Sequence, residues 1–280
     1  MTEKPPVISV LMAVYNTPPT YLDASIQSIL VQSFDNFEFI IVNDGSSAQT
    51  RKLLELAALK DGRVKVYNLP DNVGLTKALN KGLSLVTGSY IARQDADDVS
   101  LSNRLYSTLN FMESNPHFSA VGTCAYIINE DGVRIGNLVS SLKELKKRNV
   151  LVHGSMMFRK DALQRIGGYD DRMRLSQDYE VYLRMVNRFG MRIGVVPKRL
   201  YALRQHSQSI SSRRLFRQFY FSVLAKCLNR PSRGRFYNTL VFLRVFVVDF
   251  VFTHHLLLGP IVRRAWTLVR YRESKVTNRK

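Results

Sequence analysis

Four apolar segments alternate with helical patterns in the first 95 residues, and this alternation constrains the fold more than any other feature of the chain. Residues 7–14 form an apolar run, as expected of a strand that is buried on both faces. Further strands are predicted at residues 37–42, 64–69 and 90–92, and helices at residues 21–31, around 53–57 and at 75–86. Such alternation predicts an α/β fold with a Rossmann-like, mostly parallel sheet, helices on both faces and ligands outside the carboxyl ends of the strands.

The second half of the chain is less regular. A hairpin is predicted from residues 120–128 and 133–135, joined by the turn Glu130-Asp-Gly132. Strands are also predicted at residues 155–158 and 192–196, and a helix at residues 178–189.

Acidic residues crowd the carboxyl end of the fourth predicted strand, where Asp95, Asp97 and Asp98 follow one another closely. Carboxylates packed at a strand end are costly unless a cation neutralises them. Mg²⁺ that carries a nucleotide diphosphate is the usual cation, because it keeps few protein ligands and takes the others from phosphate oxygens. The alternative is a polar loop that caps the helix beginning near Asn103.

Two further loops lie at the ends of predicted strands. In the turn Asn43-Asp-Gly-Ser46, Asp44 is a candidate to accept hydrogen bonds from a base or a ribose, and its alternative role is to cap the next helix. Tyr15 either stacks on a base or fills space beneath its loop.

Three polar residues stand outside these loops. Lys77 lies in the first turn of a predicted helix, where a cation opposes the helix dipole, so it either contacts a diphosphate or is a solvated surface lysine. Asp178 begins a helix whose dipole favours the ionised carboxylate, so it is a candidate general base or a simple cap. His206 follows an apolar stretch and is either structural or a metal ligand.

Seven segments, in this order, resemble glycosyltransferase family 2, the inverting enzymes with the GT-A fold, and in particular those that build bacterial polysaccharides, O-antigens and capsules. The resemblance covers residues 7 to about 210. The segments are Ile8-Ser-Val-Leu-Met-Ala-Val-Tyr-Asn16, Ile41-Val-Asn-Asp-Gly-Ser46, Asn72-Val-Gly-Leu-Thr-Lys-Ala-Leu-Asn80, Asp95-Ala-Asp-Asp98, Gly167-Gly-Tyr-Asp170, Gln177-Asp-Tyr-Glu180 and Arg204-Gln-His206. Each segment is weak alone, but seven in order are specific.

The resemblance implies roles for the loops at the strand ends. It implies that Asp44, with Tyr15 beside it, binds the nucleotide base. It implies that Asp97 and Asp95 hold a divalent metal, Mn²⁺ or Mg²⁺.

The resemblance also implies that Asp178, which opens the late helix, is the base. The family often has Glu-Asp where this chain has Gln177-Asp178. Glu180 is therefore a rival for the base, although two residues further along it points elsewhere on the helix.

The implied reaction moves a sugar from a nucleotide-sugar donor, with a UDP-sugar expected, to a hydroxyl of a saccharide or lipid-linked acceptor. A nucleotidyltransferase usually carries a glycine-rich basic loop after its first strand, whereas this chain has Tyr15-Asn-Thr-Pro-Pro19 there. A haloacid-dehalogenase-type phosphatase carries its Asp-x-Asp pair after the first strand, not the fourth. The alternatives that remain are a nucleotidyltransferase and a nucleotide-binding protein without transferase activity.

Basic residues gather at the end of the chain. Residues 213–280 hold 15 of the 41 Lys and Arg residues and 2 of the 22 acidic residues, so they carry +13 of the net charge of +19. We therefore expect a catalytic domain at residues 1–212 and a basic, apolar-rich helical tail at residues 213–280. The tail suits a surface of anionic lipid, and its alternative is a helical subdomain packed on the sheet. Nucleic acid is not an expected partner, because the tail lacks a recognition motif.

Cys124 and Cys227 are the only cysteines, which argues against a disulfide scaffold and a structural zinc site. The first residues lack a basic start followed by an apolar run, so no signal peptide is expected. We therefore expect a cytoplasmic protein, peripheral on the cytoplasmic face of the inner membrane.

Overall fold

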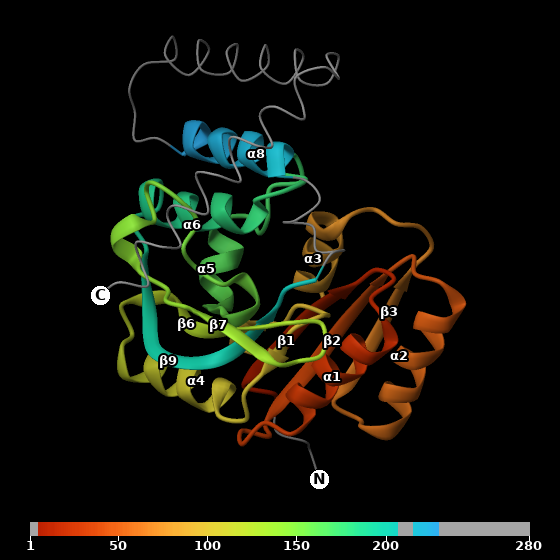
Figure 1. The fold of residues 1–280 in the computed structure, drawn as a ribbon. Helices are drawn as coiled ribbons and strands as arrows, with labels where there is room; N and C mark the ends of the chain where they lie inside the picture. The colour runs from red at the N-terminus through yellow and green to blue at the C-terminus, as the bar shows by residue number, and fades with distance from the viewer. Residues whose placement is uncertain (1–4, 207–214, 230–280) are drawn as a thin grey trace, which may run out of the picture. The chain divides into compact units, whose positions relative to one another are not determined.

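The computed structural model describes residues 5–206 and 215–229, and within these residues nine strands form one mixed sheet. Along the sheet the strands follow the order β3-β2-β1-β4-β8-β6-β9-β5, and β7 pairs with β6 outside this path. Figure 1 shows the sheet with helices on both of its faces. The predicted α/β architecture with a mostly parallel sheet and flanking helices is confirmed.

The first half of the sheet is parallel. Its strands are β1 (Ile8–Val14), β2 (Phe37–Asp44), β3 (Val64–Leu69) and β4 (Tyr90–Arg93). The helices between them are α1 (Pro19–Leu30), α2 (Ala48–Lys60) and α3 (Leu75–Leu83). All seven elements lie where the apolar pattern predicts them, and the parallel order brings the ends of β1, β2 and β4 to one edge.

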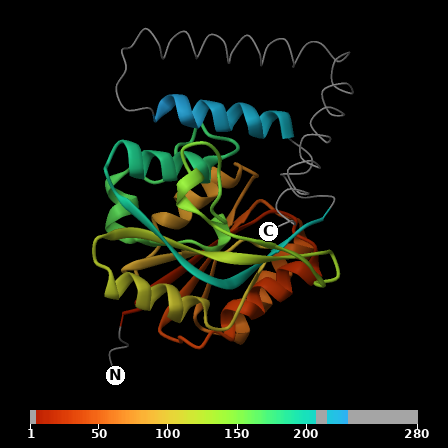
Figure 2. The same cartoon turned by 60° about the vertical axis from the view of Figure 1, so that its left-hand side comes forward.

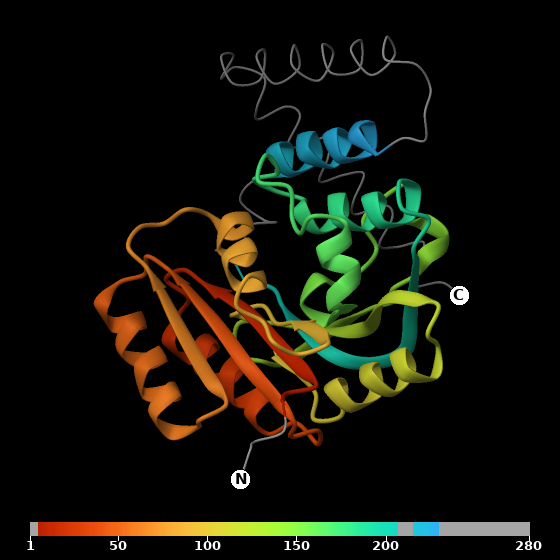
Figure 3. The same cartoon turned by 180° about the vertical axis from the view of Figure 1, so that it is seen from behind.

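Alternate side chains of the buried strands pack into two separate cores. Leu11 and Ile40 face α3, α5 and α6, whereas Met12 and Ile41 face α1, α2 and α4. Helix α3 approaches β1 closely at Gly82, where an added Cβ atom would lie 2.2 Å from Cδ1 of Leu11. Figure 3 shows the two helical layers from behind.

The second half of the sheet is antiparallel in part. Its elements are β5 (Val99–Ser100), α4 (Arg104–Ser114), β6 (Phe118–Ile128), β7 (Arg134–Leu138), β8 (Met157–Arg159), α5 (Lys160–Arg165), α6 (Gln177–Asn187) and β9 (Arg192–Arg204), with 3₁₀ turns at Leu142–Glu144 and His153–Ser155. Strand β8 runs antiparallel to both β4 and β6, and the predicted hairpin is the pair β6–β7. The structure differs from the prediction in β9, which is one long strand, and in β5 and α5, which the pattern did not indicate.

Helix α8 (Leu215–Leu228) packs on α6. Oγ of Ser222 lies 3.0 Å from Oγ of Ser176, and the guanidinium of Arg188 donates to the carbonyl of Leu228 at 2.8 Å. Figure 2 shows α8 lying over α6. Residues 215–228 of the predicted tail therefore form a helix that contacts α6. Residues 230–280 lie outside the described part of the chain. The tail as a unit and the boundary near residue 212 therefore stay predictions. In the described ranges no helix has the length and apolar character to cross a bilayer.

Candidate functional site

The three carboxylates of the acidic loop between β4 and β5 lie in two different environments. Asp98 is buried, and its Oδ1 accepts a hydrogen bond of 2.7 Å from the backbone N–H of Arg204 in β9. Burial and the charges of Asp97 and Asp95 raise the pKa of Asp98 well above its usual value. The side chains of Asp95 and Asp97 are 30% and 32% exposed. Asp98 therefore connects the loop to β9, and the other two carboxylates are partly exposed.

Arg93, the last residue of β4, is a buried cation beneath these carboxylates. Its guanidinium donates to Oδ1 of Asp95 at 2.6 Å and also to the carbonyl of Leu11. Burial raises the pKa of Asp95 and the charge of Arg93 opposes this, while the charges of Asp97 and Asp178 raise the pKa further. The charge of Asp178 thus acts on the pKa of Asp95, and their membership of one site stays a prediction.

Asp97 and His206 meet across the edge of the sheet. Nε2 of His206 lies 2.9 Å from Oδ2 of Asp97, and the imidazole ring lies 5.5 Å from the ring of Tyr21 in α1. A carboxylate and an imidazole suit a divalent cation that takes its other ligands from phosphate oxygens. In the part of the chain that the structure describes, no three His, Cys, Asp or Glu side chains are grouped to hold a metal by themselves. The residues present thus fit a metal that is shared with a substrate diphosphate.

Arg204 links three parts of this site, a role that sequence reasoning missed. Its Nε donates to the carbonyl of Asp97 at 2.9 Å, and its terminal nitrogen donates to the carbonyls of Asn129 and Glu130 at 3.1 and 2.9 Å. Its guanidinium also lies 4.4 Å from the centre of the Tyr21 ring. Arg204 therefore joins the β6–β7 turn, the acidic loop and α1. In the sequence, only its position two residues before His206 indicated that Arg204 lies near the site.

Asp178 lies in the first turn of α6, after Ser176, whose φ of 53° turns the chain into the helix. Oδ2 of Asp178 accepts a hydrogen bond of 2.6 Å from Nδ2 of Asn149. Burial raises the pKa of Asp178, although hydrogen bonds from the backbone of Tyr179 and from Asn149 lower it in part. Burial therefore outweighs the hydrogen bonds in the net effect on the pKa of Asp178, and its role as the base stays a prediction. A raised pKa brings a carboxylate closer to the range that general bases use.

Glu180, the rival carboxylate, points away from Asp178. It is 2% exposed, its Oε2 accepts a hydrogen bond of 2.9 Å from Arg184, and its Oε1 accepts one of 3.1 Å from Asn229. Glu180 thus belongs to the contact between α6 and the end of α8. This agrees with the helical spacing, which places residues 178 and 180 on different sides.

Asp44 holds the loop that precedes α3. It is buried, its Oδ1 accepts from the backbone N–H of Val73 at 2.8 Å, and its Oδ2 accepts from that of Gly74 at 3.0 Å. It does not cap α2, whose N-cap is Ser47. Base binding by Asp44 stays a prediction, and the loop that it orders lies at the end of β2.

Tyr15 lies just after β1, and Lys77 lies near the start of α3. Tyr15 follows β1 and is 53% exposed, which leaves its ring open to a ligand. Lys77 is exposed in the first turn of α3, as the sequence predicts. Their contacts with a nucleotide stay predictions.

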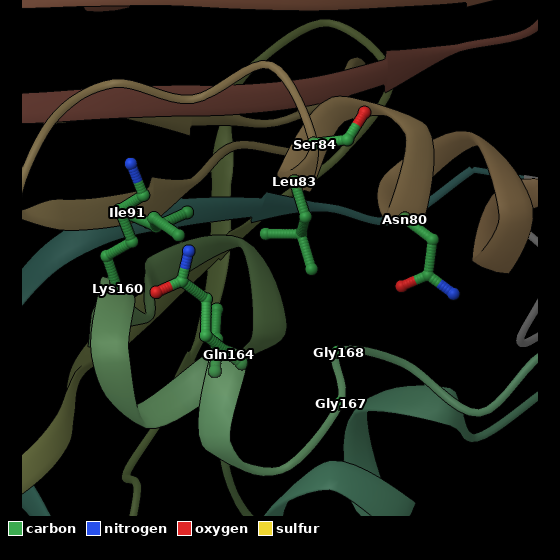
Figure 4. A pocket seen from close by; sticks show the side chains of 9 residues that line it. Asn80, Leu83, Ser84, Ile91, Lys160, Gln164, Gly167 and Gly168 are labelled. Atoms are coloured by element: carbon green, nitrogen blue, oxygen red, sulfur yellow. The ribbon is translucent and has the colours of Figure 1, made fainter.

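A cavity of about 270 Å³ lies elsewhere, between α3 and α5, as Figure 4 shows. Its lining consists of Asn80, Leu83, Ser84, Ile91, Lys160, Leu163, Gln164, Gly167 and Gly168. Asn80 donates to the carbonyl of Tyr169 at 2.8 Å, and Lys160 donates to that of Val86 at 2.9 Å. None of the predicted site residues lines this cavity, so it is separate from the site at Asp95, Asp97 and His206.

Comparison with known proteins identifies relatives. Residues 9–167 match the family described as Glycosyl transferase family 2. EpsE of Bacillus subtilis, described as a glycosyltransferase, is 32% identical over 98% of this chain and 96% of its own length. An Escherichia coli enzyme named UDP-Gal:alpha-D-GlcNAc-diphosphoundecaprenol beta-1,3-galactosyltransferase is 31% identical over 66% of this chain and 69% of its own.

Solved structures with the same fold include two glycosyltransferases. Residues 1–349 of TarS from S. aureus, in complex with UDP-GlcNAc, align with a TM-score of 0.65 and 19% identity, over 90% of this chain and 77% of that one. The mannosyltransferase PcManGT from Pyrobaculum calidifontis, with GDP-Man and Mn²⁺, aligns with a TM-score of 0.66 and 14% identity, over 98% of this chain and 83% of that one. The predicted GT-A fold is thereby confirmed.

Proposed function

The chain belongs to glycosyltransferase family 2, and from this premise we propose that it transfers a hexose-type sugar from a nucleotide diphosphate to a saccharide hydroxyl with inversion at the anomeric carbon. The observation that carries the proposal is the 2.9 Å contact between Oδ2 of Asp97 and Nε2 of His206 at one edge of the sheet. In the proposed reaction, Asp97 and His206 act at the leaving diphosphate, and Asp178 acts at the incoming hydroxyl.

The donor diphosphate is proposed to lie against the acidic loop. Asp97 and His206 would hold a divalent cation, and Asp95, oriented by Arg93, would stand beside it. A bound Mn²⁺ or Mg²⁺ supplies charge stabilisation at the leaving diphosphate, worth several kcal/mol in such sites. The PcManGT structure, which contains GDP-Man together with Mn²⁺, supports a donor that binds with a divalent cation.

The nucleoside is proposed to lie at the ends of β1 and β2. Tyr15 would stack on the base, the loop ordered by Asp44 would border it, and Lys77 would approach the diphosphate. The UDP-GlcNAc bound to TarS supports a uridine nucleotide.

Asp178 is proposed to act as the general base. Its carboxylate would accept the proton of the acceptor hydroxyl, which attacks the anomeric carbon from the side opposite the leaving diphosphate. Asn149 would keep the carboxylate oriented through its hydrogen bond to Oδ2. A positioned base contributes on the order of 10²–10⁴-fold to such a reaction.

The acceptor is proposed to be a lipid-linked saccharide, brought to the site by a tail that associates with the cytoplasmic face of a membrane. The diphosphoundecaprenol in the name of the Escherichia coli relative supports this acceptor class. The +13 charge of residues 213–280 supports the association with anionic lipid.

A donor screen tests the proposal. Purified protein is incubated with Mn²⁺, a panel of UDP-, GDP- and dTDP-sugars and a panel of saccharide acceptors on a lipid diphosphate, and the released nucleoside diphosphate is measured. One nucleotide class should be released, and Asp178→Asn should suppress the release. Release that is equal in wild type and Asp178→Asn would contradict the assigned base, and no release from any donor with any acceptor would contradict the function.

A further inference from the structure

Residues 142–149 are fixed to the helix that carries Asp178. The carbonyl of Leu145 accepts a hydrogen bond of 2.8 Å from the hydroxyl of Tyr179, and Leu145 itself is buried. At the end of the segment, Nδ2 of Asn149 donates to Asp178 at 2.6 Å. Two anchors on the first turn of α6 therefore hold this segment beside the proposed base.

The outward side of the segment is strongly basic. Lys143, Lys146 and Lys147 are exposed, and in the described part of the chain no ion-pair partner faces any of them. Arg148 pairs with Glu144 at 3.0 Å, so the segment keeps a net charge of +3. Like charges this close repel one another, and binding of an anion would relieve that repulsion.

Apolar side chains border the lysines. Leu142 is 37% exposed and Val139 is 64% exposed, directly before the basic residues in the chain. Lysines on a protein surface are usually solvated and bind nothing. Here, however, basic and apolar side chains occur together, on a segment that touches the base through Asn149.

This segment lies beside the proposed base, and so beside the acceptor hydroxyl that the base would deprotonate. A hydroxyl that gives its proton to Asp178 lies beside Asn149, because Asn149 contacts the same carboxylate. Residues 142–149 therefore border the space beside Asp178 that the remainder of the acceptor would enter. Its chemistry should complement that of the segment, with negative charge for the lysines and an alkyl chain for Leu142 and Val139.

We propose that residues 142–149 bind the diphosphate of a saccharide acceptor carried on a lipid diphosphate, with Val139 and Leu142 against the first carbons of the lipid. The proposal rests on the proposed function, since it assigns the acceptor side of the same site. It assigns the lysines to the acceptor itself, not to the bulk anionic surface of a membrane.

Binding of geranyl diphosphate to the full-length protein tests the proposal. The measurement is made with EDTA, so that the diphosphate cannot bind through a metal at Asp97. The triple variant Lys143→Gln, Lys146→Gln, Lys147→Gln should raise the Kd for geranyl diphosphate by about 10-fold or more, since three exposed ion contacts are lost. Its affinity for UDP with Mn²⁺ should equal that of wild type.

The matched control removes three exposed charges from α2, in the variant Arg51→Gln, Lys52→Gln, Lys60→Gln. It should leave the Kd for geranyl diphosphate unchanged. An equal loss in the control, or no loss in the first variant, would overturn the proposal. So would a first variant that loses affinity for phosphatidylglycerol vesicles but not for geranyl diphosphate, because the lysines would then contact the membrane. The protein could also bind geranyl diphosphate through the lysines but bind no nucleotide. That result would contradict the proposed function and leave this proposal standing.

Discussion

His206 places Nε2 2.9 Å from Oδ2 of Asp97, although 109 residues separate the two in the chain. The contact arises because β9 ends beside the loop that follows β4, where Asp98 and Arg204 also join the two segments. An imidazole and a carboxylate are thus brought together at the strand ends, where a parallel α/β sheet binds its ligands.

Replacement of Asp178 by Asn should lower kcat by about 10²–10⁴-fold, because the amide cannot accept the proton of the acceptor hydroxyl. Affinity for the nucleotide diphosphate with Mn²⁺ should change little, since Asp178 acts on the acceptor. Steady-state kinetics and calorimetry on the same samples check both statements. Glu180→Gln is the comparison, and its effect should be on stability because Glu180 is buried with Arg184 and Asn229. Near-normal turnover of Asp178→Asn would remove it from the role.

The pH dependence of kcat should reflect the burial of Asp178. Burial raises the pKa of this carboxyl above the usual 3.8, so the ionised base is lost, and kcat falls, as the pH drops through a value higher than 3.8. The hydrogen bond from Asn149 lowers the pKa, so Asn149→Ala should move the acidic limb of the profile to higher pH. A limb that moves to lower pH in this variant would be inconsistent with the assignment.

Arg204→Lys should raise the Mn²⁺ concentration needed for half-maximal activity, because lysine cannot donate at once to Asp97 and to the β6–β7 turn. Loss of such an orienting contact typically costs about 10–100-fold in metal affinity. Titration of activity with Mn²⁺ measures the effect.

Arg134→Lys is the matched control for this change. Arg134 lies on the same hairpin but contacts Asn137 and the ring of Tyr126. The Arg134→Lys variant should reach half-maximal activity at the same Mn²⁺ concentration as wild type. If both variants shift equally, the contact of Arg204 with the acidic loop is not what supports the metal site.

Glu38 should stabilise the fold above the acid range. Burial alone would raise its pKa, but hydrogen bonds from Lys65, Ser9 and Thr87 hold the pKa at about 2, against 4.5 in the unfolded chain. Its contribution, up to about 3 kcal/mol, is therefore present above pH 4.5 and is lost as the pH falls toward 2.

Glu38→Gln should accordingly lower the free energy of unfolding at pH 7, and the difference from wild type should shrink as the pH falls below 4.5. Urea unfolding at several pH values measures this. Glu55→Gln, at an exposed position of α2, should change stability by less than about 0.5 kcal/mol. A difference between Glu38→Gln and wild type that grows on acidification would contradict the account.

The sequence was sufficient for the parallel half of the fold, because each strand there is a short apolar run between helical patterns. It was insufficient for β9, whose segment Pro197-Lys-Arg199 interrupts the apolar pattern although β6 pairs with the strand on both sides of it. It was also insufficient for β5, which contains only two residues and depends on its pairing with β9.

The sequence indicated which acidic side chains follow the strands better than it indicated the hydrogen bonds that these side chains make. Asp95 and Asp97 lie at the end of β4, as the alternation of elements indicates, whereas His206 reaches Asp97 through β9, whose course the sequence did not show. The bridge made by Arg204 depends on the carbonyls of a distant turn, and no local pattern reports these. The raised pKa of Asp178 likewise depends on burial by segments remote in sequence.

Calorimetric titration with the nucleoside diphosphate identified in the donor screen, with and without Mn²⁺, tests the central claim most directly. Wild type should bind it in a metal-dependent manner, Asp97→Ala should lose that binding, and Asp23→Ala, which removes an exposed carboxylate of α1, should retain it. Undiminished, Mn²⁺-dependent affinity in Asp97→Ala would contradict the claim that this carboxylate, with His206, holds the cation for the leaving diphosphate.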